Sequence, residues 1–388
     1  MKKIVTLSAL TLTLAITLLA CTRRAPKPVA SAPPADVPDV PALTVANETE
    51  WNAALLAIKN GGNNKTYAIQ VTASFDISGT TENAPYFQPT FGSVQDITVT
   101  INGYAGTEAI SVKTGTKHCI LKIDTRQNVI INNISLKGNS ANENSLVEVD
   151  SASASFTMKG SASISDTNAD VDWGGGVVSK GNFVMQDSAS IHDNKNVIGG
   201  GGVCILNGNF TMKDRARIYN NTTRDGGGGV WVWGGNFTMQ DSASVSANTS
   251  AYSHGGGGVW VSKGTFTMKD NASVFDNAAL NSMGGGVLVS PHSNGDAAAF
   301  IMEGGSVYGN KSTGGVMGKG GGVAVFKDNT GSAHFSMSKG TIYGADAEEK
   351  APNTVESGGA GAALYVDTGN TVQPATLATS EKTVKGGG

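Results

Sequence analysis

The chain has 388 residues, of which 52 are glycine and three are cysteine, and its formal net charge is −3. This balance leaves no basic surface that could neutralise phosphates, so it excludes a nucleic-acid partner. The cysteines and histidines show no metal-ligand spacing, and we expect neither a metal nor another cofactor. A chain of this length could form two ordinary domains or one continuous repeat array.

Residues 1–20 have the layout of a secretory signal, because two lysines precede an apolar run over residues 4–20 that is too short for a comfortable membrane span. The run ends in Leu18-Leu19-Ala20-Cys21, which resembles the lipobox of bacterial lipoproteins. That resemblance implies cleavage before Cys21, acylation of Cys21 by palmitate or similar chains, and anchoring to a membrane through lipid. Thr22 follows the cysteine, which by the same resemblance favours the outer membrane. The alternative is an ordinary signal peptide with a chance cysteine.

Residues 21–45 form the next segment, which combines the lipidated cysteine with a tether. Six of the eleven prolines lie between residues 22 and 43. Such a composition favours extended polyproline conformations over a packed core, so the sequence predicts a semi-rigid spacer.

Residues 46–94 are expected to hold a short capping helix and the first strands. Asn47 is a candidate N-cap, and Trp51, Leu55 and Ile58 recur at helical spacing before Gly61-Gly62 ends the helix. Apolar runs at residues 67–71, 97–101, 119–123 and 129–136 predict strands. The helix would cover an open end of stacked strands, which otherwise invites aggregation.

A Phe-x-Met phrase recurs seven times between residues 156 and 337. The steps from one Phe to the next are 27, 27, 27, 29, 34 and 35 residues, and seven of the ten methionines lie in this slot. Such regular spacing is typical of a repeat architecture. The last steps are longer because of loops near residues 291–299, 311–319 and 345–357, where a function beyond the repeat itself would be sought.

One repeat, residues 226–254, explains the fold. After four glycines come Val230-Trp231-Val232, then Phe237-Thr238-Met239, then Ala243-Ser244-Val245, with turn residues between them. In each segment the first and third residues are apolar and share one face, while the middle residue points the other way. Three such strands would turn their apolar faces toward a shared interior. Coils of this kind stack at about 4.8 Å into a parallel β-helix. We therefore predict an all-β chain with about ten coils over residues 95–367.

An asparagine follows the aliphatic residue of the third segment by three positions in five repeats. Stacked asparagines hydrogen-bond to each other and to their own turns, so we interpret this column as a structural ladder and not as a binding site. The ladder residues are Asn194, Asn221, Asn248, Asn277 and Asn310.

The phrase Gly-Gly-Gly-Val, followed later by Ile/Val-x-x-Asn, resembles the repeats of polymorphic outer-membrane proteins, which pair GGA-(Ile/Leu/Val) with FxxN. More broadly, the repeats resemble right-handed β-helix proteins of the pectate-lyase-like superfamily. The resemblance implies a right-handed coil. Residues 368–388 are either a glycine-ended tail or the start of a truncated next coil.

The outward residues of the glycine-led strand form the candidate partner-binding stripe: Trp231, Trp233, Trp260, Leu288 and Phe326. We expect this apolar stripe to be exposed and to bind a protein or a polysaccharide, since exposed patches of this kind often mark binding faces. The alternatives are that neighbouring loops cover the stripe or that it packs on a second subunit.

No catalytic constellation emerges from the sequence. Asp187, Asp214, Asp241 and Asp270 recur at one turn of successive repeats, which turn chemistry explains, and the histidines share no slot. The sequence therefore predicts a non-catalytic, lipid-anchored protein of the cell envelope, a surface adhesin or a protein that binds host or matrix molecules. The alternatives are a carbohydrate-active β-helix enzyme of the polysaccharide lyase or hydrolase type, a polysaccharide-binding module, and a purely structural spacer.

Overall fold

The computed structural model describes residues 42–78, 90–170, 173–251, 255–314, 317–327, 331–344, 350–356 and 359–367, and the backbone of two further strands, β36 (Thr371–Val372) and β37 (Lys382–Lys385). The signal segment, Cys21 and most of the predicted tether lie outside these residues. All of the described residues belong to one compact unit.

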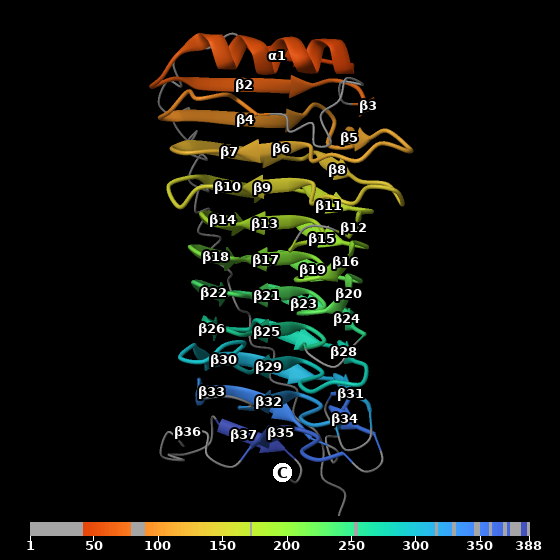
Figure 1. Ribbon diagram of the computed structural model, residues 1–388, viewed down its shortest axis with the longest axis vertical. Coiled ribbons are helices and arrows are strands. Elements are labelled where there is room, and N and C mark those ends of the chain that lie inside the picture. Colours follow the sequence, from red (N-terminus) through yellow and green to blue (C-terminus); the bar gives the residue numbers. More distant parts are fainter. Residues whose placement is uncertain are drawn as a thin grey trace, which may run out of the picture. The chain divides into compact units, whose positions relative to one another are not determined.

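The unit is a right-handed parallel β-helix, in which every pair of neighbouring strands is parallel (Figure 1). Each regular coil passes through four strands that belong to four columns, which we call sheets I to IV. In one such coil these are β21 (Val230–Val232), β22 (Asn236–Met239), β23 (Ser244–Ser246) and β24 (Thr249–Ser250). The sequence predicted three strands per coil, and the fourth is the short segment directly after the ladder asparagine.

Sheet I carries the Phe-x-Met phrase and sheet II the aliphatic residue before each ladder asparagine. Sheet I contains β1 (Leu43–Val45), β2 (Thr66–Val71), β4 (Ile97–Gly103), β7 (Gln127–Asn132), β10 (Ser155–Lys159), β14 (Asn182–Met185), β18 (Asn209–Met212), β22, β26 (Gly264–Met268), β30 (Ala297–Tyr308), β33 (Ser332–Tyr343) and β36. Sheet II contains β3 (Phe75–Ile77), β5 (Ala109–Val112), β8 (Ser135–Lys137), β11 (Ser163–Ser165), β15 (Ser190–His192), β19 (Arg217–Tyr219), β23, β27 (Ser273–Phe275), the second halves of β30 and β33, and β37.

Sheet III is short and sheet IV follows the glycine runs. Sheet III contains β12 (Asn168–Ala169), β16 (Lys195–Ile198), β20 (Thr222–Asp225), β24, β28 (Ala278–Ala279), β31 (Lys311–Ser312) and β34 (Thr354–Val355). Sheet IV contains β6 (Leu121–Ile123), β9 (Val147–Val149), β13 (Val177–Ser179), β17 (Val203–Ile205), β21, β25 (Val259–Val261), β29 (Val287–Val289), β32 (Val323–Val325) and β35 (Leu364–Val366). Among the described residues sheet IV has nine strands, so the stack has about nine coils where the sequence predicted about ten.

Helix α1 (Glu48–Gly61) lies at the N-terminal end of the stack and covers it, as the sequence predicted (Figure 1). The Asn47 side chain accepts a hydrogen bond from the Glu50 N–H at 3.0 Å, and the Glu50 carboxylate accepts one from the Ala46 N–H. Trp51 and Ile58 are fully buried against the first coil. Leu43–Val45, which the sequence placed at the end of the tether, is strand β1 beneath this helix and pairs with β2.

The early coils differ from the predicted strands, because β3, β5 and β9 were not predicted and one predicted run is divided in two. The run 129–136 forms two strands, β7 and β8, because Asn133 adopts a left-handed backbone (φ 52°) and turns the chain between them. This turn divides sheet I from sheet II, as Asp turns do in later coils.

The interior is a single continuous hydrophobic core built from the inward residues of sheets I, II and IV. The Phe-x-Met phenylalanines stack in register, with ring centroids 4.5 Å apart for Phe183 and Phe210 and 4.7 Å for Phe210 and Phe237. The Phe-x-Met phrase is therefore core packing, as its period implied.

Candidate functional site: the outer face of sheet IV

The predicted stripe forms one continuous column on sheet IV. Trp231 pairs in register with Cys204 on one side and with Trp260 on the other, and Trp260 pairs with Leu288. The flanking valines Val230 and Val232 face the core, so the middle residue of each strand faces outward. The outward direction was correctly predicted.

The expected exposure of this column is wrong. Trp231, Trp260 and Leu288 expose only 2, 5 and 4% of their surface, and they form a second hydrophobic cluster outside the β-helix core. Trp233 and Phe326 are half-buried beside it. Side chains from other coils cover the column, which is one of the two alternatives that the sequence left open.

The buried indoles are fixed in place. The rings of Trp231 and Trp260 stack with centroids 4.7 Å apart and planes 4° from parallel. The Trp231 Nε1–H donates to Ser262 Oγ at 2.9 Å, and the Trp260 Nε1–H donates to the Ser290 carbonyl at 3.0 Å. Because both N–H groups have partners, these two rings are a structural floor and have no donor left for a ligand.

Three rings lie over this floor, and we call Trp173, Trp233 and His292 the aromatic shelf. Trp173 is 41% exposed, and its ring centroid lies 5.1 Å from that of Trp233. His292 is exposed and lies 4.6 Å from Trp233. The shelf rings are tilted by 58° and 50° against Trp233, so they present ring faces at different angles instead of one flat stack.

Sequence reasoning named Trp233 but missed the other two shelf residues. Trp173 precedes its glycine run and so lies in a different slot of the repeat from Trp231. His292 lies in the first of the three lengthened loops, which the spacing did mark as a place to look. Gly199 makes room for Trp173, since a Cβ at Gly199 would overlap the Trp173 carbonyl.

The lower end of the same face carries a cation. Lys319 Nζ lies 4.7 Å from the ring centroid of Tyr365 and 5.8 Å from that of Phe326, and it hydrogen-bonds to Tyr365 Oη at 3.1 Å. The Lys319 ammonium therefore lies over the ring faces of Tyr365 and Phe326, which a ligand would otherwise contact. At Cys204, under the middle of the face, burial raises the pKa of the thiol, so it is held as a neutral side chain.

The five ladder asparagines form a buried column in the structure. The Oδ1 of Asn248 accepts from both the backbone N–H and the Nδ2–H of Asn221 at 2.9 Å, and its Nδ2 donates to Asn277 Oδ1 and the Ile218 carbonyl. The ladder continues to Asn353, which the sequence analysis missed because the lengthened loop moves it 43 positions beyond Asn310. With all four side-chain bonds made inside the protein, Asn248 has little capacity left for a ligand.

The aspartate column is also part of the backbone framework. Asp187, Asp214, Asp241 and Asp270 all adopt left-handed φ values between 50° and 57°. Each of the last three accepts, through Oδ2, the N–H of the aspartate one coil earlier, at 3.0–3.1 Å. Of the five histidines, His254 lies outside the described residues. Across the described ranges, no group of three or more His, Cys, Asp and Glu side chains is placed to hold a metal ion.

Comparisons with protein-family models, with curated proteins and with solved structures found no match for this chain. In the part of the chain that the structure describes, no helix combines the length and hydropathy that a bilayer span requires.

Proposed function

We propose that this chain is a lipid-anchored, non-catalytic protein of the cell envelope that binds a protein or polysaccharide partner through the aromatic shelf. The observation that carries the proposal is the partly exposed shelf of Trp173, Trp233 and His292 over a buried tryptophan floor. Aromatic rings held rigidly by packing lose little conformational entropy on binding, and this favours them as anchors.

The buried floor supports a small anchor site in place of the long stripe that the sequence predicted. With Trp231, Trp260 and Leu288 covered, and with Lys319 over the half-buried rings of Phe326 and Tyr365, the shelf at the upper part of the face offers the more accessible aromatic surface. We therefore place the partner contact at the coils of β13, β17 and β21 and at the loop that carries His292.

The envelope location rests on the sequence. The lipobox-like Cys21, the proline-rich segment after it and the resemblance of the repeats to those of polymorphic outer-membrane proteins support an outer-membrane, surface-facing location. Replacing Cys21 with Ser should abolish incorporation of labelled palmitate and release the protein from membranes. Palmitate labelling that persists in this variant would rule out Cys21 as the lipidation site.

The shelf is tested by adhesion. Cells that display the protein would be allowed to bind surfaces coated with matrix protein or with polysaccharide, and Trp173→Ser with Trp233→Ser should lower their retention at least severalfold. Tyr104→Ser is the matched control, because Tyr104 is 75% exposed and lies on β-helix coils away from the shelf. Equal retention of the folded shelf variant and of the control would refute the shelf, and protease resistance of the chain on intact cells would refute surface display.

The alternative of a polysaccharide-binding module shares the same shelf, since sugar rings stack on aromatic faces. Retention on polysaccharide coatings alone would favour that module. A structural spacer predicts no retention on either coating.

A further inference from the structure

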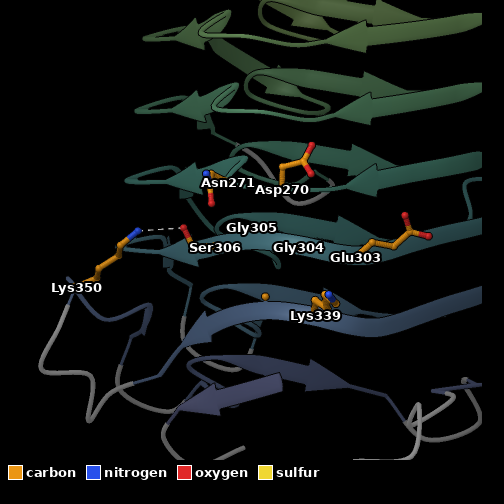
Figure 2. Close-up of a pocket in the computed structure, with 9 residues that line it drawn as sticks. Asp270, Asn271, Glu303, Gly304, Gly305, Ser306, Lys339 and Lys350 are labelled. Atoms are coloured by element: carbon orange, nitrogen blue, oxygen red, sulfur yellow. Dashed lines mark hydrogen bonds between the residues drawn. The ribbon is translucent and has the colours of Figure 1, made fainter. Parts of the chain in front are cut away.

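A second candidate site is lined by polar, charged and glycine residues and lies at the corner between sheets I and II in the last coils. It is a notch of about 590 Å³ lined by Asp270, Asn271, Glu303, Gly304, Gly305, Ser306, Lys339, Gly340 and Lys350 (Figure 2). Its residues are unrelated to the aromatic shelf.

The notch exists because two successive coils are one residue shorter at this corner. Met268 pairs with Met302 and Ser273 with Ser306, so residues 269–272 of the upper coil face only residues 303–305 of the coil below. The next coil keeps the shorter corner. The projecting Asp turn is replaced by glycines, and β30 and β33 run through the corner as single strands.

Glycine is required on the floor of the notch. A Cβ at Gly304 would lie 2.6 Å from the Asp270 nitrogen, and Gly305 and Gly340 have φ values of 85° and 104°. The floor is therefore backbone without side chains, a surface that lets a ligand approach closely.

Charge changes sign at the same place. The aspartate column ends at Asp270, and the coils below carry Glu303 and then Lys339. Both carboxylates already have partners, because Asp270 Oδ2 accepts from the Asp241 N–H at 3.1 Å and Glu303 forms an ion pair with Lys269 at 3.2 Å.

Lys350 supplies a cation that is held in position. Its Nζ lies 4.2 Å from the Tyr308 ring centroid and 5.8 Å from that of Tyr343, and it donates to Ser306 Oγ at 3.1 Å. Tyr308 is itself stacked on Phe275, with centroids 5.0 Å apart. An ammonium has three N–H donors and Ser306 Oγ takes one of them here, so this cation, held by aromatic faces and a hydroxyl, suits an anion.

We propose that this notch binds a sugar-sized ligand that bears a phosphate or sulfate monoester. The anionic group would lie at Lys350, at the end of the notch opposite Glu303, whereas Lys339 pairs in register with Glu303 (Figure 2). Hydroxyl groups of the ligand would face Asn271, Ser306 and the glycine backbone, which offer donors and acceptors. A volume of about 590 Å³ is larger than a bare ion needs and lies within the usual range of small-molecule sites.

The experiment is a calorimetric titration of the mature chain with glucose 6-phosphate, glucose 6-sulfate, glucose and inorganic phosphate. We expect both monoesters to bind more tightly than glucose and than inorganic phosphate, and more weakly as salt is raised. Lys350→Met should weaken binding of the monoesters by about tenfold to a hundredfold, because it removes a charge-assisted hydrogen bond. Lys350→Arg should keep most of the affinity, since a guanidinium also stacks on aromatic rings.

Lys213→Met is the matched control, because Lys213 occupies the same corner four coils above Lys339 and lies outside the notch. It should leave the affinity unchanged. The proposal is overturned if neither monoester binds, if glucose binds as tightly as its monoesters, or if Lys350→Met binds as the parent does. Inorganic phosphate binding as tightly as the monoesters would refute the sugar component. None of these results bears on the aromatic shelf, which is tested by adhesion.

Discussion

The asparagine ladder makes a quantitative prediction for Asn248→Ala. The substitution removes four buried side-chain hydrogen bonds and leaves the Asn221 backbone N–H without its acceptor. Net losses of about 1 kcal/mol per bond, with a larger penalty for the orphaned N–H, give a destabilisation of about 3–5 kcal/mol. Urea unfolding followed by circular dichroism measures the free energy of unfolding, and hydrogen exchange measures protection of the Asn221 amide.

Asn209→Ala is a matched control within the same coils. Asn209 also bridges two coils, by donating to Asn182 at 3.2 Å and accepting from Asn236 at 3.0 Å, but these groups are exposed to water. Its loss should cost less than about 1 kcal/mol. Equal destabilisation by the two variants, or continued protection of the Asn221 amide in Asn248→Ala, would refute the idea that the ladder stabilises the coils because its hydrogen bonds are buried.

Three further changes test the framework. Phe237→Ala removes a fully buried ring stacked 4.7 Å from Phe210 and 4.8 Å from Phe266, and it should cost about 3–5 kcal/mol in urea unfolding. Gly228→Ala places a Cβ 2.7 Å from the Thr249 backbone and should lower the thermal midpoint clearly, whereas no change would show that the glycine run is not packed as described. The Ala105 N–H, with those of Gly106 and Thr107, holds the pKa of Glu108 below its ordinary value. The stabilisation by ionised Glu108 is therefore complete above about pH 4.3 and is lost as the pH falls through the lower pKa of the folded state. Glu108→Gln should then make the free energy of unfolding depend less on pH in the acid range.

The repeat period alone determined the fold class. Residues that alternate along short segments and recur every 27 positions can bury their apolar faces only by stacking coil on coil, so the inward place of Phe237 and Met239 followed directly from the sequence. The helix cap at Asn47 was predicted for an equally local reason, because its side chain bonds to a backbone group three residues on.

Exposure could not be read from the same pattern. The alternation placed Trp231 outward, but whether an outward ring meets water depends on residues far along the chain, here Trp173 and His292. Their contacts with the stripe form only after coils 58 and 61 residues apart in sequence have stacked. The notch also depended on tertiary structure. The corners at Gly304 and Gly340 are one residue shorter than the corner at residues 269–272, and this leaves a hollow only because the longer coil lies above them. The sequence by itself thus determined the coil and its interior, where the periodic residue contacts copies of itself. The surface depended on the folded stack, because there each residue contacts unlike residues from other coils.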